Sequence, residues 1–369
     1  MKVAFVLPHY PWLPVGLFSV VYSHANQLAA RGHNVTLIHA YQLRQVIVAP
    51  PDNWKTMRNT WRTLRHWWRR NHPPKFWMPI SPAVQITFLA GEPSPVAIPD
   101  SDLVIATSFS TAEYVQEYPT SKGTKCYLVQ GYETWESNET KVKELWRNET
   151  LKKIVVSQWL KDRAIVLGVR HVWYVPNAID HARFYVEHAT VQRHPGIIGL
   201  YHRAPVKGGK ELLESLSRIH RRFPSIPITL FGVRPRTKLI PPWIRYYRKP
   251  SPNLLRKLYN SNTVFVSASY SEGFSLTPAE AMACGCVFVG TDSGGPRDYA
   301  VSLETALLSS PGDIPTLCDN VYRVITDESL SARLAQNGRR KVIGMTWDRS
   351  GEKMALALTE IVKGHSSDV

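Results

Sequence analysis

Two glutamates, Glu272 and Glu280, stand eight positions apart in the stretch SEGFSLTPAEAMACG, and together they could bind a hydroxyl-rich anion. Thr277 followed by proline predicts a helix over Pro278–Cys284 that stops at Gly285. Glu280 would then lie in the first turn, beside backbone N–H groups that have no partner inside the helix. Those N–H groups can bind an anion, and each carboxylate can accept hydrogen bonds from neutral hydroxyls. The pattern indicates a site for a sugar nucleotide, although an acid near a helix start can also simply complement the helix dipole.

A pair of cations precedes the glutamates. Arg203 and Lys207 lie in the segment HRAPVKGGK, which follows the predicted strand Ile197–Tyr201 and leads into a helix. On such a strand-to-helix loop both cations can converge on one anion beside the helix N-terminus. In a basic chain the pair could also be surface charge. The predicted strand Ile228–Gly232 and the glutamate stretch that follow favour binding of an anion over plain surface charge.

The elements that must position these residues belong to an α/β pattern. Short apolar runs alternate with helical patterns, which is typical of a parallel sheet. The further predicted strands are Val3–Leu7, Val35–His39, Val84–Leu89, Leu103–Thr107, Cys126–Gln130, Ile154–Ser157, Val172–Val175, Val264–Ser267 and Val287–Thr291. The further predicted helices are Ser19–Arg31, Asn253–Asn260, Ile314–Thr326, Leu330–Gly344 and Arg349–Val362.

Length and composition limit the class of protein. A chain of 369 residues predicts two domains, and 44% hydrophobic residues is typical of a soluble globular protein. No apolar run is long enough for a membrane-spanning helix, and the N-terminus reads as a first strand rather than a signal peptide. Four scattered cysteines predict neither a disulfide framework nor a zinc site, since Cys284 and Cys286 lack the usual zinc spacing. We therefore expect a reduced, cytoplasmic protein without a structural metal.

The net charge of +16 favours a polyanionic partner. Between Asp52 and Pro79, tryptophans and other apolar residues recur at helical spacing, with a stripe of Lys and Arg one residue further round. A basic helix with tryptophans over residues 54–70 would suit the surface of an anionic membrane. The alternative is that the tryptophans pack on the domain core while the arginines face water. Nucleic acid is disfavoured because no recognisable nucleic-acid-binding module is present.

The glutamate stretch closely resembles the E-x7-E signature of glycosyltransferase family 4, and it precedes a predicted buried strand and a D-S-G-G turn, as in that family. The segments RGHNV at 31–35 and VPNAID at 175–180 also resemble family elements. The resemblance implies the GT-B fold, with two Rossmann-like domains facing a central cleft and a C-terminal helix that crosses back to the first domain. The domains would be 1–177, with 350–369 crossing back, for the acceptor, and 178–349 for the nucleotide-sugar.

The resemblance also implies a reaction: transfer of a glycosyl group from a nucleotide-sugar, with retention of anomeric configuration and without a metal ion or other cofactor. Arg203 and Lys207 would neutralise the diphosphate, Glu272 would hold sugar hydroxyls, and Glu280 would hold the ribose. Further donor contacts would come from Gly16 and from the backbone of Gly273, Phe274, Ser275, Leu276 and Thr277.

The sequence indicates the acceptor-binding residues less clearly than the donor-binding residues. In the segment YLVQGYETW, Tyr132 could stack on a sugar and Glu133 could accept hydroxyl bonds, or the segment could be a structural turn. Many family members have a histidine where this chain has Ser108, so Ser108 is a candidate substrate contact. His9 at the end of the first strand is the candidate for the space of that histidine, or it is a plain loop histidine.

The leading hypothesis is a glycosyltransferase, peripheral at the inner face of the membrane, that adds a hexose or deoxyhexose to a glycan or lipid-linked acceptor in cell-surface polysaccharide synthesis. A nucleotide-sugar epimerase or a phosphorylase could share the two-domain plan, but neither accounts for the E-x7-E stretch. The non-enzyme alternative is a catalytically weak paralogue that acts as a scaffold in a polysaccharide assembly complex. The intact Arg203, Lys207, Glu272 and Glu280 argue against it.

Overall fold

The computed structural model describes residues 1–41, 43, 76–187 and 195–364. The predicted basic, tryptophan-rich helix at 54–70 lies outside the described residues. Among the residues that are described, no helix is long and apolar enough to cross a membrane.

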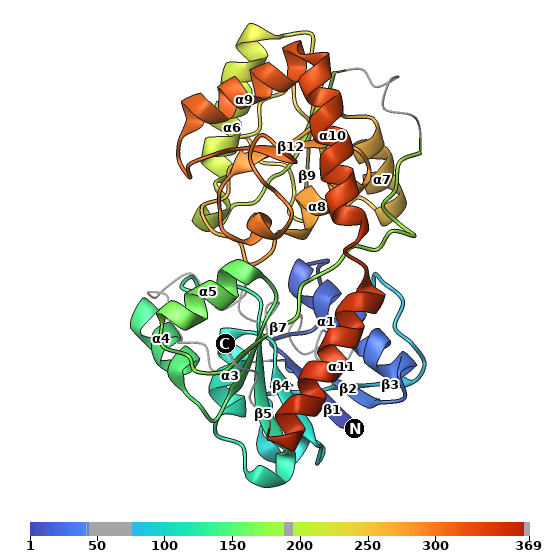
Figure 1. The fold of residues 1–369 in the computed structure, drawn as a ribbon, viewed down its shortest axis with the longest axis vertical. Helices are drawn as coiled ribbons and strands as arrows, with labels where there is room; N and C mark the ends of the chain where they lie inside the picture. The colour runs from blue at the N-terminus through green and yellow to red at the C-terminus, as the bar shows by residue number, and fades with distance from the viewer. Residues whose placement is uncertain (42, 44–75, 188–194, 365–369) are drawn as a thin grey trace, which may run out of the picture. The chain divides into compact units, whose positions relative to one another are not determined.

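The chain divides into two compact units (Figure 1). Unit 1 comprises Met1–Val155, Ala164–Trp173 and Gly351–Val369, and unit 2 comprises Val156–Arg163 and Tyr174–Ser350. The division between the units therefore passes close to the predicted borders at 177 and 350. The grouping of residues 156–163 with unit 2 was not predicted.

Unit 1 contains a parallel sheet in the order β3-β2-β1-β4-β5-β6-β7. The strand order reverses between β1 and β4, which pair directly, and this is where ligands bind in open α/β sheets. Its strands are β1 (Lys2–Leu7), β2 (Asn34–His39), β3 (Val84–Phe88), β4 (Leu103–Ala106), β5 (Thr124–Val129), β6 (Lys152–Val155) and β7 (Val172–Tyr174). The helices are α1 (Gly16–Ala30), η1 (Pro95–Ala97), α3 (Phe109–Val115), η2 (Thr120–Lys122) and α4 (Glu139–Arg147). The helix α5 (Gln158–Val166) follows β6, and its residues up to Arg163 are grouped with unit 2.

Unit 2 contains a second parallel sheet, in the order β10-β9-β8-β11-β12-β13. Its strands are β8 (Ile197–Leu200), β9 (Ile228–Gly232), β10 (Arg245–Arg248), β11 (Val264–Ser267), β12 (Val287–Thr291) and β13 (Ala306–Ser309). The helices are η4 (Pro205–Lys207), α6 (Gly209–Arg222), α7 (Pro252–Asn260), α8 (Leu276–Ala283), η5 (Gly295–Asp298), α9 (Ile314–Thr326) and α10 (Glu328–Ile343). The last helix, α11 (Trp347–Lys363), begins in unit 2 and continues in unit 1 from Gly351.

Both sheets are buried by helices, which explains why their central strands read as unbroken apolar runs. Every residue of β9 and β12 is buried, and in unit 1 the same holds for β4. In unit 2, α6 packs beside α9, and α10 packs against α8 and β12 (Figure 1). In unit 2, side chains of α6, α9 and α10 form one apolar core with those of the strands β8, β9, β11, β12 and β13.

The last helix, α11, passes from one unit to the other along the chain. Its residues from Gly351 onward belong to unit 1, where Gly351 lies against Gln27 and the indole of Trp173 donates to Glu360 over 2.9 Å. A crossing C-terminal helix was predicted, and the structure confirms it as part of the fold.

The predicted strands are all present, with shifts of one or two residues at their ends. The sequence analysis missed β10 and β13. β10 is an edge strand with the sequence RYYR and exposed arginines at both ends, so it lacks the apolar run that marks the central strands.

Candidate functional site

An ion pair joins the two halves of the predicted donor site. The Nζ atom of Lys207 donates to Oε2 of Glu272 over 2.7 Å, and Oγ of Ser269 donates to Oε1 of the same carboxylate over 2.9 Å. The Glu272 side chain is only 10% exposed. The carboxylate is therefore fixed at both oxygens, and the cation of Lys207 lies at the same point of unit 2.

Gly208 brings the cation loop against the end of the strand that precedes Glu272. It has φ +58°, and a Cβ there would lie 1.9 Å from the backbone oxygen of Ala268. Gly209 lies against the start of its own loop, since a Cβ there would lie 2.2 Å from the backbone oxygen of His202. Only glycine fits at these positions, because backbone meets backbone. Gly208 thus holds the predicted diphosphate loop next to the strand end that leads to Glu272.

The DSGG turn after β12 holds the other side of the glutamate loop. The backbone N–H of Glu272 donates to Ser293, and the N–H of Gly295 donates back to Glu272. A Cβ on Gly295 would lie 2.5 Å from the backbone nitrogen of Phe274, so this turn also requires glycine. The turn packs the loop against the sheet through backbone contacts.

The loop from Glu272 enters α8 with a strained residue. Ser275 is the N-cap and has φ +68°, a conformation that is uncommon for residues other than glycine. In the part of the chain that the structure describes, the backbone N–H groups of residues 273–277 donate to no protein acceptor. A row of free donors at a helix start is a ready binding site for an anion.

The helix itself begins earlier than predicted. α8 starts at Leu276 rather than Pro278, and the cap is Ser275 rather than Thr277. The prediction that Glu280 lies in the first turn is therefore wrong: it lies one turn further along α8. The physical reason is that the left-handed conformation of Ser275 already turns the chain into the helix, so Pro278 sits inside the first turn.

Glu280 is partly buried, and Oε2 lies 3.4 Å from the hydroxyl of Tyr259. Burial raises the pKa of Glu280 to about 8, while the Tyr259 hydrogen bond opposes the shift. At neutral pH the group is therefore largely protonated, so it can both donate a hydrogen bond to a hydroxyl and accept one.

Arg203 lies on the same loop but takes no part in the ion pair. It is exposed, and it has no hydrogen-bond or ion-pair partner among the described residues. The positive charge of Arg203 opposes the rise in the pKa of Tyr246 that burial causes. The preceding residue, His202, has a lowered pKa because of burial and the nearby Lys207. Convergence of Arg203 and Lys207 on one anion stays a prediction.

In unit 1, the structure gives the predicted acceptor residues different positions. His9 is exposed after β1, with its ring edge-on to Phe18. Gly16, which was predicted as a donor contact and not as an acceptor residue, is the exposed first residue of α1. Ser108 is fully buried and caps α3, where its hydroxyl accepts from Thr111.

For the segment after β5, the sequence offered two alternatives, a sugar contact or a structural turn, and the burial of its side chains is typical of a structural turn. Glu133 is 3% exposed, and its Oε2 accepts hydrogen bonds from the Tyr127 hydroxyl and, over 2.6 Å, from the backbone N–H of Phe109. Burial raises the pKa of Glu133 to about 8. Tyr132 is also buried and donates to Glu139. A contact of these residues with a sugar stays a prediction.

The sequence analysis missed three residues of these sites. Ser269 holds Glu272, and Tyr259 holds Glu280 from α7. Trp135 is the exposed aromatic residue of the loop after β5, at 51% exposure. Neither Ser269 nor Tyr259 is marked by spacing in the sequence, since their contacts depend on packing between elements.

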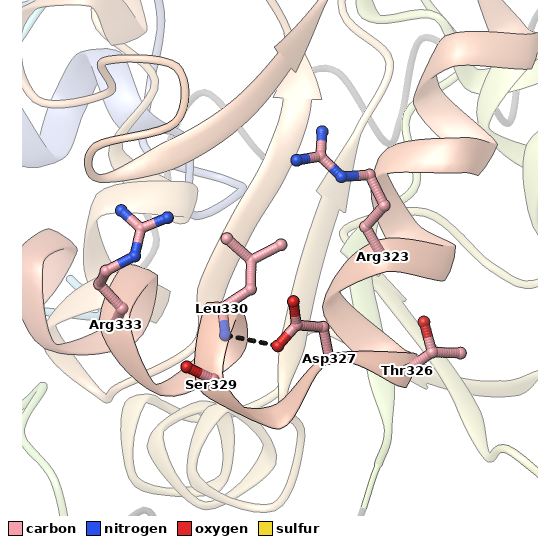
Figure 2. Close-up of a pocket in the computed structure, with 6 residues that line it drawn as sticks. All are labelled: Arg323, Thr326, Asp327, Ser329, Leu330 and Arg333. Atoms are coloured by element: carbon pink, nitrogen blue, oxygen red, sulfur yellow. Dashed lines mark hydrogen bonds between the residues drawn. The ribbon is translucent and has the colours of Figure 1, made fainter.

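A separate pocket lies at the junction of α9 and α10 (Figure 2). Asp327 accepts from the backbone N–H of Leu330 over 2.8 Å and so occupies the start of α10, flanked by Arg323 and Arg333. The pocket shares no residue with the glutamate site. Among the described residues, no cluster of three or more His, Cys, Asp or Glu side chains could hold a metal ion.

The sequence of this chain is similar to those of known glycosyltransferases in the region that contains Lys207 and Glu272. Residues 192–341 match the family model described as "Glycosyl transferases group 1". The sucrose-phosphate synthase of Spinacia oleracea is 31% identical over 96 residues, which are 26% of this chain and 9% of that enzyme. The capsular polysaccharide biosynthesis glycosyltransferase CapM of Staphylococcus aureus is 25% identical over 209 residues, which are 53% of this chain and 55% of CapM. The matched segment thus spans about a tenth of the first relative and about half of the second.

Among solved structures, Alr3699/HepE of Anabaena in complex with UDP-glucose has a TM-score of 0.71 and 16% identity, with 98% of this chain and 100% of that chain covered. At this identity the likeness shows the fold. The predicted resemblance to GT-B glycosyltransferases is confirmed, and the narrower assignment to family 4 stays a prediction. The chain has the GT-B fold, and its residues 192–341 match the glycosyl transferases group 1 family.

Proposed function

We propose that the protein transfers a sugar from a nucleotide-diphosphate donor to a hydroxyl of a glycan or lipid-linked acceptor, with retention of anomeric configuration. The observation that carries the proposal is the Lys207–Glu272 pair, which lies beside free backbone donors at the start of α8. A cation and N–H groups suit a diphosphate, and a fixed carboxylate suits sugar hydroxyls. The family match over 192–341 contains all of these residues.

The same groups would assist the reaction. When the glycosyl bond to the diphosphate breaks, negative charge grows on the leaving phosphate oxygen. The ammonium of Lys207 and the backbone donors of 273–277 would stabilise that charge without moving, since both are already held in place. Arg203, which is exposed and unpaired among the described residues, would close on the diphosphate as a second cation.

Glu272 would orient the donor sugar. With Oε1 bound by Ser269 and Oε2 by Lys207, the carboxylate keeps lone pairs for sugar hydroxyls. Its rigid position would hold the anomeric carbon in one place relative to the diphosphate. Glu280, largely protonated at neutral pH, would bind the ribose hydroxyls.

Two relatives support the substrate class. Alr3699/HepE, which shares the fold, was solved with UDP-glucose bound, and the name of CapM refers to capsular polysaccharide biosynthesis. By analogy with these two relatives, we propose that this chain uses a nucleotide-sugar donor and an acceptor of cell-surface polysaccharide synthesis. We further propose that the transferred sugar is a hexose or deoxyhexose, and that no metal is needed because Lys207 and Arg203 supply the positive charge.

Incubation with a panel of nucleotide-sugars and oligosaccharide or lipid-linked acceptors tests the function. Release of a nucleoside diphosphate with a matching gain of one sugar on the acceptor, in the presence of EDTA, is the expected result. Conversion of the donor without acceptor extension would indicate an epimerase or hydrolase instead. Donor binding without any turnover would indicate a scaffold.

We also propose a cytoplasmic protein that associates with anionic membrane surfaces. The proposal rests on the net charge of +16 and on the predicted helix at 54–70. In unit 2, residues 215–271 contain eleven Lys or Arg and no Asp or Glu, so positive charge extends beyond the predicted helix. The protein should co-sediment with vesicles that contain phosphatidylglycerol and not with pure phosphatidylcholine vesicles; equal binding to both would contradict the proposal.

A further inference from the structure

The loop after β5 is held against the neighbouring strand end by three side chains. Gln130 donates to the backbone oxygen of Thr107 over 3.2 Å, and Glu133 accepts from Phe109. Glu136 accepts from the backbone N–H of Ser110 over 3.2 Å. The loop therefore has a fixed conformation at the carboxyl end of β5, beside the end of β4.

Within this loop, side chains point to opposite sides. Tyr132 and Glu133 are buried, whereas Trp135 is 51% exposed. The indole is supported from below by Gly131: a Cβ at that position would lie 2.8 Å from Cη2 of the ring. Because Gly131 has no side chain, the indole of Trp135 packs directly on the backbone there, while about half of Trp135 remains exposed to solvent.

The neighbours of Trp135 in the loop are polar. Thr134 and Glu136 are exposed, and Oε2 of Glu136 accepts from the backbone N–H of Ser110. The Glu136 carboxylate keeps further lone pairs, which can accept from the hydroxyls of a ligand.

We infer that Trp135 is a stacking platform for a pyranose ring of the acceptor glycan, with the Glu136 carboxylate accepting from its hydroxyls. A sugar ring has one apolar C–H face and a rim of hydroxyls, which matches an exposed aromatic ring bordered by acceptors. The loop lies at the carboxyl edge of the sheet, next to β4, where the strand order reverses. The inference rests on the proposed function and assigns to Trp135 the role that the sequence suggested for Tyr132.

The test measures sugar binding and turnover separately. Isothermal titration with a panel of neutral di- and trisaccharides needs no turnover, and the best binder then serves as acceptor in a transfer assay. Trp135→Ala should weaken saccharide binding and raise the acceptor KM by about tenfold or more, with little change in kcat. Trp135→Phe, which keeps an aromatic face, should retain most of the binding.

A third variant displaces the indole without removing it. Gly131→Ala leaves the indole in the chain but pushes it from its support, so it should also weaken saccharide binding. Tyr185→Ala, at an aromatic residue of unit 2 that is 42% exposed, is the control and should leave saccharide binding unchanged. Nucleoside diphosphate binding should be the same in all four variants.

The outcomes separate this inference from the proposed function. Wild-type saccharide affinity in Trp135→Ala would overturn the inference even if the protein is a glycosyltransferase. Saccharide binding that depends on Trp135, in a protein without transferase activity, would support the platform and overturn the proposed function. Loss of nucleoside diphosphate binding in Trp135→Ala, with an unchanged melting temperature, would overturn the inference about Trp135, because the aromatic ring would then bind the donor.

Discussion

The Nζ atom of Lys207 and the Oε2 atom of Glu272 lie 2.7 Å apart, although 65 positions separate them in the chain. The contact joins the loop after β8 to the loop after β11, two strands that pair directly in the sheet of unit 2. The ion pair brings the residue predicted to bind the diphosphate next to the residue predicted to bind the sugar. Neither motif alone specifies this proximity.

Removal of the cation should abolish most of the transfer. Lys207→Ala takes away the charge beside the leaving diphosphate, so kcat/KM should fall by about 100-fold or more. Steady-state kinetics with the identified donor measures the effect. Lys210→Ala, at an exposed lysine on the next turn of the same segment, is the matched control and should keep near-normal turnover.

Glu272→Gln and Glu272→Ala should differ. The amide oxygen of glutamine can still accept from Ser269, so the loop should stay in place, whereas alanine leaves Ser269 and Lys207 without their acceptor. We expect both variants to lose transfer and only the alanine variant to lose melting temperature as well. Near-normal turnover in either variant would contradict the assignment of Glu272 as a sugar ligand.

Gly208→Ala should destabilise unit 2. The new Cβ would lie 1.9 Å from the Ala268 oxygen in a backbone with φ +58°, so the free energy of unfolding should drop by more than about 2 kcal/mol. Chemical denaturation measures the change. Gly312→Ala has a similar positive φ, +83°, but its nearest neighbour would be 3.5 Å away, so it should cost only about 1 kcal/mol. Equal losses would show that backbone strain, and not the close approach of the two loops, sets the cost.

The raised pKa of Glu133 should make the stability of the folded protein depend on pH. Its pKa rises from an ordinary 4.5 to about 8 because of burial, so the folded state holds the proton more tightly than the unfolded state does. The stabilising contribution is complete below about pH 4.5 and is lost as the pH rises through about 8. Glu133→Gln cannot ionise, so from pH 5 to 9 the wild type should lose melting temperature relative to this variant. Parallel profiles would mean that Glu133 is already ionised at the lower pH.

Glu280 should act on the ribose and not on the phosphates. Glu280→Gln should weaken binding of the preferred nucleoside diphosphate by about tenfold, the cost of one lost hydrogen bond to a polar group, and should leave inorganic pyrophosphate binding unchanged. Calorimetric titration of both ligands makes the comparison. An equal loss for both would place Glu280 at the diphosphate.

The sequence predicted the elements that depend on local pattern. Apolar runs located the central strands, and the order of arginine, lysine, glycine and glutamate singled out Lys207 and Glu272, which the structure brings together in the candidate site of unit 2. It failed where packing decides. The sequence left open whether Glu133 and Tyr132 contact a sugar or form a structural turn, because the burial of Glu133 depends on the backbone N–H of Phe109 at the start of α3, far away in the chain. Likewise, the left-handed turn at Ser275 shifts the start of α8, and no residue type in that stretch signals it.

The most direct test of the account is calorimetric titration of UDP, GDP, dTDP and ADP into the wild type and into Lys207→Ala, with EDTA present. The account predicts that at least one nucleoside diphosphate binds the wild type and that the variant binds it at least about tenfold more weakly, since a charged contact to the diphosphate is lost. Undiminished binding to Lys207→Ala, or no binding of any of the four to the wild type at millimolar concentration, would contradict a diphosphate site at the Lys207–Glu272 pair.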